Sequence, residues 1–531
     1  MTKNPYTFLG HSRSTGAGNG SRMLLQESAE AIVAVPMQAA KGRTQHEDPR
    51  PWRLDRVARQ QRLSDYETRE GSGTKGRDGI PTLARGAPQV PSGAKVHDGD
   101  ADPPSLLARA LHPDNLQTAI ENVKKNKGAP GVDDMTTAEF PAWWDQHGAS
   151  ITAKLLAGKY RPSPLRRVLI PKPDGKGVRL LGIPTVLDRV IQQAILQIVQ
   201  PLVDPSFSDH SYGFRPERSA HQAVRQAKQY IESGYDWVVD LDLEKFFDQV
   251  NHDVLMDRVS KRLQDRDLLA LIRRYLRAGV MQNGILSASE MGTPQGAPLS
   301  PILANILLDD LDRELERRGH RFVRYADDVS IYVQSEASGK RVLASVSRFL
   351  EHKLQLRVNQ DKSAVDRAWK RMLLGFSFVK RRDGSIGVSL AKRSIARFRA
   401  RVRLLTGKWA RGHSMGEVVA GLNRYLVGWF GYFQLVEFES KFEGLDGWLR
   451  RRLRRLVWRQ WVRPRTRFRE LVARGVSEKM AAHMAWSSKG PWRLSRSQAT
   501  HRALPNRWFS DELGLFELLA ASRQRGPLDV L

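Results

Sequence analysis

Two adjacent carboxylates, Asp327 and Asp328, lie within the stretch "RFVRYADDVSIYV", Arg321–Val333. The β-branched and aromatic residues on either side favour strands, and the short side chains of Ala326 and the two Asp suit a tight turn. The stretch therefore predicts a β-hairpin with acid at its tip. One explanation is an ordinary turn, since Asp bonds locally to the backbone. The other is a hard cation that neutralises two like charges, which requires a further carboxylate.

A third carboxylate with suitable placement is Asp242, in "YDWVVDLDLEKFFDQVNHDVL". This stretch opens as a buried strand and then turns helical, which places Asp242 near the carboxyl end of the strand. Asp240 lies on the same face two residues earlier, whereas Asp248 falls in the following helix as a surface or capping acid. Three carboxylates that hold two magnesium ions ~3.5–4 Å apart can activate a 3′-hydroxyl and stabilise a departing pyrophosphate. The pattern predicts nucleotidyl transfer, with Asp242, Asp327 and Asp328 as metal ligands and catalytic residues.

The composition indicates the class of partner. The 531 residues include 86 Lys and Arg against 57 Asp and Glu, a formal net charge of +29, so a polyanion is the expected partner. The 13 Trp and 18 Phe provide rings that can stack on bases, although most belong in a core. The absence of Cys excludes disulfides, thiol catalysis and Cys-ligated zinc. No stretch approaches ~20 uninterrupted apolar residues, so we expect a soluble, cytoplasmic protein without a membrane partner.

The elements that must position these residues differ along the chain. Residues 1–104 are rich in Gly, Ser, Pro and Arg and are predicted to form a flexible basic leader. Residues 105–385 mix helical periodicity with short strands, which is an α+β pattern. Strand signals then fade, so we expect a helical domain over 386–480 and a basic nucleic-acid-binding tail over 481–531.

Several motifs, in this order, are similar to those of a known family. The string Tyr325–Asp328 follows "SYGFRPERSAHQAV", "VVDLDLEKFFD" and "GTPQGAPLSPILANILLDDLD", and it precedes "GLNRYLVGWFGYF". From about Leu106 to about Leu519 the chain resembles bacterial group II intron-encoded proteins, which are reverse transcriptases. The resemblance implies a right-hand polymerase, with fingers and palm over 105–385 and a thumb/maturase domain over 386–480.

The resemblance also assigns roles to individual residues. It favours Asp242 over Asp240 as the first catalytic carboxylate, given the spacing to the paired aromatics that end in Phe247. Phe247 would lie beneath the sugar and exclude a 2′-hydroxyl, although core packing also explains a Phe here. A surface lysine is the ordinary explanation of Lys362, which the resemblance assigns to protonation of pyrophosphate. The remaining expected roles are triphosphate binding by Lys172 and Arg179, a nucleotide contact by Gln295, and a grip on the primer end by Gly375 and Phe376.

An arginine-rich stretch, Trp448–Glu470, contains ten Arg and is predicted to be one helix with one apolar face. The apolar face consists of Leu449, Leu453, Leu456 and Val457. The polar face is expected to bind phosphates, and an exposed Trp to stack on a base. A helix on a membrane surface is the alternative explanation of the same pattern. The residues expected to contact RNA are Arg450, Arg451, Arg454, Arg455 and Trp458, with Trp461 as the alternative aromatic.

Together the motifs predict an RNA-directed DNA polymerase that uses two Mg²⁺ ions and also acts as a maturase in intron splicing and mobility. Its expected partners are group II intron RNA, an RNA template with a DNA primer, and dNTPs; a homodimer is compatible with the sequence. A splicing factor that has only the polymerase fold is one alternative, against which the three Asp argue. A reverse transcriptase of phage defence or sequence diversification is another, against which the block 421–433 argues less decisively. Many members of the family that the chain resembles carry a C-terminal endonuclease with metal-binding His and paired Cys. Because this chain has no Cys, the resemblance implies the type that lacks the endonuclease.

Overall fold

The computed structural model describes residues 104–524, apart from 172–177, 283–284, 288–290 and 294–295. The described residues form three β-sheets among helices, and only helices follow Leu390. The predicted α+β class is therefore confirmed. The predicted leader, 1–104, lies outside the described residues except for its last residue.

The first described part combines helices with a four-stranded sheet. Its helices are α2 (Leu106–Ala110), α3 (Pro113–Asn126), α4 (Phe140–Leu156) and α5 (Val186–Val203). The sheet has the order β2-β1-β4-β5, from β1 (Leu165–Pro171), β2 (Val178–Ile183), β4 (Val280–Gln282) and β5 (Ile285–Ser287). The strands β1 and β2 form an antiparallel hairpin, and α3 packs along α5.

A second four-stranded sheet, which we call the central sheet, carries the predicted hairpin in the order β6-β7-β3-β8. Its strands are β3 (Trp237–Leu241), β6 (Arg321–Tyr325), β7 (Asp328–Val333) and β8 (Ala364–Arg367), each antiparallel to its neighbours. Ala326 and Asp327 join β6 to β7, so the hairpin expected from the sequence is confirmed. The short helix α7 (Phe246–Gln249) follows β3, as expected.

Helices cover both faces of the central sheet, which explains why β6 and β7 are buried along most of their length. Helix α6 (Ala220–Glu232) packs on the face that carries Val238 and Tyr332. Helix α11 (Glu336–Phe349) packs on the face that carries Val239 and Ile331. The other helices of this part are α8 (His252–Ser260), α9 (Arg266–Arg277) and α10 (Ser300–Arg317), and α10 supports β6.

The helical C-terminal part starts from a two-stranded sheet of β9 (Phe376–Lys380) and β10 (Ile386–Leu390). Three long helices follow, α12 (Lys392–Leu405), α13 (Met415–Phe433) and α14 (Glu439–Gln460). The rings of Phe376 and Phe433 lie 5.2 Å apart between centroids, and those of Phe398 and Trp429 lie 4.6 Å apart. The hairpin and the helices therefore share one core, and the boundary expected after residue 385 falls between β9 and β10.

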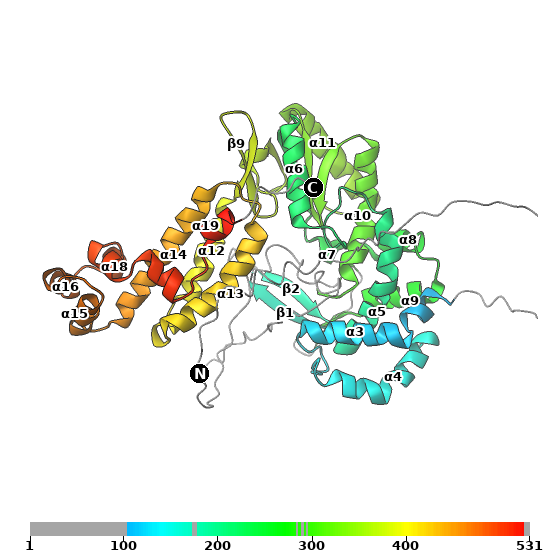
Figure 1. The fold of residues 1–531 in the computed structure, drawn as a ribbon. Coiled ribbons are helices and arrows are strands. Elements are labelled where there is room, and N and C mark those ends of the chain that lie inside the picture. The colour runs from blue at the N-terminus through cyan, green and yellow to red at the C-terminus, as the bar shows by residue number, and fades with distance from the viewer. Residues whose placement is uncertain (1–103, 172–177, 283–284, 288–290, 294–295, 525–531) are drawn as a thin grey trace, which may run out of the picture. The chain divides into compact units, whose positions relative to one another are not determined.

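The last described helices fold back onto α14. They are α15 (Pro464–Ala473), α16 (Glu478–Ala485), α17 (Pro491–Leu494), α18 (Gln498–Ala503) and α19 (Leu518–Arg523). Helices α17 and α19 contact α14, and Figure 1 shows α19 alongside it. The carboxylate of Asp446 in α14 accepts hydrogen bonds from the amides of Leu518 (3.1 Å) and Leu519 (2.9 Å). The residues of the predicted tail that the structure describes, up to 524, are therefore folded into the core of α14, and nucleic-acid binding by this region stays a prediction.

The arginine-rich stretch is not the single helix that its periodicity predicts. Helix α14 ends at Gln460 and α15 begins at Pro464, because proline lacks an amide hydrogen and restricts the preceding residue. The predicted apolar face is confirmed, since its four residues are at most 3% exposed. None of the described helices combines the length and the apolar character that crossing a membrane requires.

Candidate active site and nucleic-acid interface

The three predicted carboxylates lie at one end of the central sheet. In the register of β3 and β7, Leu241 pairs with Val329, so Asp242 and Asp328 are the next residues along the two strands. Asp327 precedes Asp328 in the turn between β6 and β7. The strand that leads to Asp242 thus runs directly beside the hairpin that carries the other two carboxylates. The backbone therefore brings the two acidic segments next to each other, which a shared metal site would require.

The chemistry of these residues fits a hard divalent cation, because Mg²⁺ prefers carboxylate oxygens. Asp327 is half-buried and Asp328 is exposed, so both are accessible to solvent. Across 104–524, gaps excepted, no three His, Asp or Glu side chains converge closely enough to hold a metal ion. Asp242 instead pairs with Lys362, with 3.0 Å between Oδ2 and Nζ. A cation at Asp242 would compete with this ammonium group.

Hydrogen bonds between a loop and the end of β3 set the position of Lys362. The amide of Asn359 donates to the carbonyl oxygen of Asp242 (2.8 Å), and the amide of Asp242 donates to Ser363 Oγ (3.0 Å). The Lys362 side chain is 62% exposed, so its ammonium group contacts Asp242 and is also accessible to solvent. An accessible amine at this place can donate a proton to a leaving group.

Asp240, the alternative metal ligand, is engaged in a different contact. Its Oδ2 lies 2.6 Å from Nη2 of Arg371, which also donates to the carbonyl oxygen of Lys362 (3.1 Å). Burial raises the pKa of Asp240, and the hydrogen bonds from Arg371 oppose that shift. Asp240 therefore helps to hold the loop of Lys362, and the choice of Asp242 over Asp240 as a metal ligand stays a prediction.

The turn between β6 and β7 is held by Arg324, a residue that the sequence analysis did not single out. Arg324 is 0% exposed, and its Nη2 lies 2.5 Å from Oδ2 of Asp312 in α10. Its Nη1 donates to Asn305 Oδ1 (2.9 Å) and to the carbonyl oxygen of Ala326 (3.0 Å). Ala326 has a left-handed φ of 58°, a conformation that persists in a non-glycine residue where neighbouring groups hold it. Arg324 is thus a positioning residue for the turn that carries the paired carboxylates.

A loop that precedes α6 closes against the same turn. The amide of Tyr212 donates to the carbonyl oxygen of Arg324 (2.9 Å), and Asn305 Nδ2 donates to the carbonyl oxygen of Gly213 (2.9 Å). A Cβ on Gly213 would lie 2.3 Å from the backbone nitrogen of Ala326. Glycine is therefore required here by the close approach of two backbone segments.

We expect Gly213→Ala to displace the turn and to reduce turnover at the carboxylates by about 100-fold, the typical effect of a ~1 Å misplacement in a catalytic site. Gly447→Ala is the matched control, because a Cβ at Gly447 meets no atom within 4 Å. Turnover and melting temperature should be measured for both variants. A folded Gly213→Ala protein with wild-type turnover would show that the turn does not depend on this close approach.

Among the residues predicted to contact the nucleotide, Phe247 is the one whose side chain is described. The structure does not describe the side chains of Lys172, Arg179 and Gln295. The backbone of Arg179 in β2 pairs with that of Ile170 in β1. Phe246 is 2% exposed and Phe247 half-buried, with ring centroids 5.1 Å apart. Phe246 is therefore a core residue, and the contact of Phe247 with a sugar stays a prediction.

The segment predicted to hold a primer end is fixed between α12 and α13. The carbonyl oxygen of Gly375 accepts a hydrogen bond from Ser394 Oγ (2.7 Å), and that of Leu374 accepts one from the Tyr432 hydroxyl (2.9 Å). Gly375 has a φ of 84°, which favours glycine. Phe376 is 0% exposed, so its ring anchors the segment in the core, and the grip of this segment on a primer end stays a prediction.

The arginines predicted to contact RNA are mostly engaged within the protein. Arg450 forms a 2.9 Å ion pair with a glutamate beside α19, and Arg451 lies 3.9 Å above a tryptophan ring centroid. Arg454 is 2% exposed and donates to a backbone carbonyl (2.8 Å), so its predicted RNA contact is wrong. Arg455 is half-buried and forms no ion pair among the described residues.

The predicted base-stacking tryptophans are buried. Trp458 is 1% exposed and Trp461 is 8% exposed, so neither ring can stack on a base. The guanidinium of Arg467 in α15 lies 5.3 Å from the ring centroid of Trp458. The prediction fails because α15 and the segments after it cover this side of α14.

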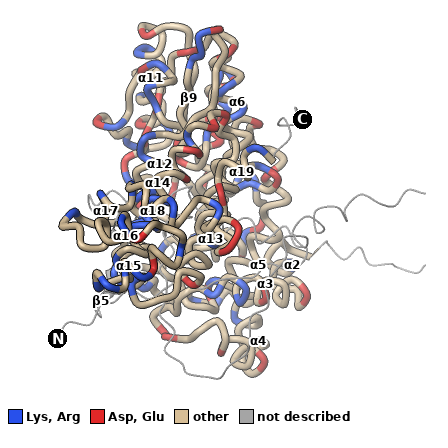
Figure 2. Tube along the Cα trace, turned by 60° about the vertical axis from the view of Figure 1, so that its left-hand side comes forward, with Lys and Arg blue, Asp and Glu red and all other residues tan. Residues whose placement is uncertain are grey.

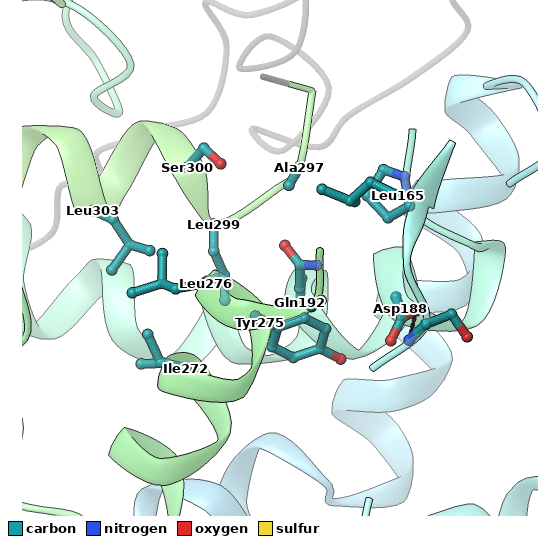
Figure 3. A pocket seen from close by; sticks show the side chains of 13 residues that line it. Leu165, Asp188, Gln192, Ile272, Tyr275, Leu276, Ala297, Leu299, Ser300 and Leu303 are labelled. Atoms are coloured by element: carbon teal, nitrogen blue, oxygen red, sulfur yellow. Dashed lines mark hydrogen bonds between the residues drawn. The ribbon is translucent and has the colours of Figure 1, made fainter. Parts of the chain in front are cut away.

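A small cavity lies at the junction of β1, α5, α9 and α10 (Figure 3). Its volume is about 20 Å³, enough for a single water molecule and too small for a nucleotide. On its wall, Asp188 accepts hydrogen bonds from the Tyr160 hydroxyl (2.8 Å) and Thr185 Oγ1 (2.7 Å). Burial raises the pKa of Asp188, and these hydrogen bonds oppose that shift. The carboxylate therefore ties the segment before β1 to the start of α5, and the cavity is a packing feature of the junction.

Two family models match adjacent parts of the chain. The model for reverse transcriptase (RNA-dependent DNA polymerase) matches residues 170–378, which include all three predicted carboxylates. The model for the maturase-specific domain of group II introns matches residues 395–475, which include α13 and α14. The division between the two matches agrees with the change from mixed to helical structure.

Individual relatives are similar over about half of the chain. Protein YkfC of Escherichia coli (strain K12) is 33% identical over 300 residues, which cover 49% of this chain and 78% of YkfC. Group II intron-encoded protein LtrA of Lactococcus lactis subsp. cremoris is 29% identical over 348 residues, which cover 53% of this chain and only 57% of LtrA. Among solved structures, a partial Cas6-RT-Cas1–Cas2 complex is 26% identical over 47% of this chain and 43% of that chain, with a TM-score of 0.32.

Proposed function

Because this chain belongs to the family of group II intron-encoded reverse transcriptases with a maturase domain, we propose that it copies intron RNA into DNA and assists intron splicing and mobility. The observation that carries the proposal is the placement of Asp242 beside Asp327 and Asp328, within the reverse transcriptase match. The proposed partners are group II intron RNA, an RNA template with a DNA primer, and dNTPs, and the proposed location is the cytoplasm.

Asp242, Asp327 and Asp328 would hold two Mg²⁺ ions, which when bound activate the primer 3′-hydroxyl and neutralise charge on the triphosphate. Arg324 donates a hydrogen bond to the carbonyl oxygen of Ala326, whose φ is left-handed, and so supports the turn that carries the paired carboxylates. Lys362, whose Nζ lies 3.0 Å from Oδ2 of Asp242, is the proposed donor of a proton to the leaving pyrophosphate.

Three further residues are proposed to bind the incoming nucleotide. Lys172 and Arg179 lie seven residues apart in the sequence and carry the positive charge that binding of a triphosphate requires. Gln295 comes five residues before Ser300, the first residue of α10, and its amide can contact the nucleotide. The amide of Thr293, two residues before Gln295 in the sequence, donates to the carbonyl oxygen of Phe247 (2.6 Å).

The proposed activity is tested by incubation of the purified protein with a labelled DNA primer on an RNA template, dNTPs and Mg²⁺. The expected product is an extended strand that DNase degrades and RNase spares. Extension only with ribonucleotides, or only on a DNA template, would contradict the assignment as an RNA-directed DNA polymerase.

We expect Phe247→Val to admit ribonucleotides, because the smaller side chain removes the proposed steric barrier to a 2′-hydroxyl. The preference for dNTP over rNTP should fall by at least about tenfold, as when a pocket gains the room of one or more methylene groups. Phe247→Tyr is the matched control, since it keeps the ring and should keep the preference. Single-nucleotide incorporation measures both variants, and an unchanged preference in a folded Phe247→Val protein would make Phe247 a packing residue.

A further inference from the structure

One side of α14 presents arginines that no described carboxylate neutralises. Each residue of an α-helix turns by about 100°, so Arg452, Arg455 and Arg459 fall within about 60° of one another around the helix. Arg452 donates to Thr406 Oγ1 (2.5 Å) and to the carbonyl oxygen of Arg403 (3.1 Å). These bonds place the end of α12 beside the three arginines of α14.

The turn Trp409–Gly412 brings a further arginine to the same side. Gln460 Nε2 in α14 donates to the carbonyl oxygens of Ala410 (3.1 Å) and His413 (2.8 Å), so Arg411 lies next to the end of the helix. The arginine cluster is defined as Arg403, Arg411, Arg452, Arg455 and Arg459. Arg403, Arg411 and Arg459 are exposed, and the other two are half-buried. Figure 2 shows Lys and Arg along α12 and α14, the helices that carry most of the cluster.

The charge of the arginine cluster is not balanced within the described chain. No Asp or Glu lies between Asp383 and Glu417 or between Asp446 and Glu470, the segments that supply the cluster. None of its five guanidiniums pairs with a carboxylate in the part of the chain that the structure describes. Burial and the neighbouring guanidinium charges lower the pKa of Arg452 to about 10. Like charges held this close repel one another, and a bound polyanion would relieve that repulsion.

We propose that the arginine cluster binds the phosphate backbone of RNA. Guanidinium groups bind phosphate oxygens bidentately, and the rise of ~10 Å from Arg452 to Arg459 spans on the order of three phosphates of one strand. Trp409 is 36% exposed and stacks on His413 at 3.9 Å between ring centroids, so an accessible ring flanks the cluster. The proposal rests on the proposed function and moves the RNA contact to the side of α14 that the C-terminal helices leave uncovered.

A membrane surface is the other polyanion that an arginine-rich amphipathic helix can bind. Binding to a membrane surface requires an apolar face that enters the lipid. On α14 that face is buried in the protein core, where Leu449 and Leu453 are 0% exposed. The structure therefore favours RNA as the ligand of the arginine cluster.

The test compares two triple variants of the full chain that change the charge equally. Arg411→Gln with Arg455→Gln and Arg459→Gln removes three cluster guanidiniums that form no ion pair within the described residues. Arg463→Gln with Arg465→Gln and Arg469→Gln removes three exposed arginines next to or within α15. The probes are a fluorescein-labelled RNA stem–loop over a range of salt concentrations, and vesicles of phosphatidylcholine with phosphatidylserine.

The cluster variant should flatten the slope of log affinity against log salt by about 2, at ~0.7 per lost phosphate contact. The same relation gives a loss of affinity on the order of 100-fold at ~0.1 M salt. The α15 variant should change the slope by less than about 1. Extension of a pre-annealed primer should be unchanged in the α15 variant, whereas the cluster variant should need a higher template concentration to reach its maximal rate, because template binding is weaker and the palm carboxylates are unchanged.

If the wild-type protein extends the primer, any of three outcomes would overturn the proposal. They are an unchanged salt slope in the cluster variant, equal losses of RNA affinity in the two triple variants, and a cluster variant that no longer binds vesicles but keeps its RNA affinity. Failure of the proposed function has a different signature, which is an absence of extension by wild-type protein whose RNA affinity still depends on the arginine cluster.

Discussion

Asp327→Ala and Asp242→Ala are each expected to abolish RNA-templated DNA synthesis while RNA affinity stays close to that of the wild-type protein. Each variant removes a carboxylate from the end of the central sheet, and metal ions in such sites contribute several kcal/mol to transition-state stabilisation. At ~1.36 kcal/mol per tenfold, the loss of turnover should be on the order of 10³-fold or more. RNA affinity should persist because the basic surface is unchanged.

The measurement is turnover and RNA affinity on one preparation of each variant. Asp145→Ala is the matched control, since Asp145 is an exposed carboxylate on α4 and its loss changes the net charge equally. We expect wild-type turnover in this control. If a folded Asp327→Ala protein still synthesised DNA on an RNA template, the assignment of the active site would be wrong.

Arg324→Met is expected to be strongly destabilising. It leaves the carboxylate of Asp312, which is 0% exposed, buried without its 2.5 Å partner. Removal of one member of a buried ion pair typically costs about 3–5 kcal/mol of folding free energy. The carbonyl oxygen of Ala326 also loses its donor, so the turn of the paired carboxylates loses its support. Denaturant unfolding measures the first effect, and turnover measures the second.

A double variant separates these two effects. In Arg324→Met with Asp312→Leu both charges are replaced by apolar groups, an exchange that often costs little stability. We expect this protein to regain most of the lost folding free energy while turnover remains depressed by at least about tenfold. Mg²⁺ that binds the folded protein stabilises it, and the Mg²⁺ concentration that gives half of this stabilisation should also rise, because the carboxylates are less well positioned. Full recovery of turnover together with stability would make the buried pair a purely structural feature.

The central sheet could be predicted from the sequence because its signals are local. β-branched and aromatic residues identify β3, β6 and β7, and the two Asp mark the turn. Arg324 could not be identified from the sequence, because its role depends on hydrogen bonds to Asp312 and Asn305. These two residues lie in α10 and contact Arg324 only in the folded protein. A charged residue inside an otherwise buried strand was the available signal, since such a residue needs a buried partner.

The accessible, arginine-bearing side of α14 could not be predicted, because periodicity shows which face is apolar but not what covers the rest of the helix. Trp458 lies about 180° from Leu449 around the helix, so a single amphipathic helix would expose it. In the structure the segments from Pro464 onward return across that side and bury Trp458 and Arg454. The arginines that stay accessible are identified only once this long-range packing is known.

The most direct test of the central claim is synthesis of DNA on an RNA template by wild-type protein, with Asp328→Asn assayed in parallel. Both proteins should first be shown to fold and to bind the same RNA–DNA primer-template. The account predicts that the wild-type protein extends the primer to the end of the template in a Mg²⁺-dependent reaction, and that the variant gives no extension above background. Equal extension by the two proteins, or none by a wild-type protein that binds the primer-template, would contradict it.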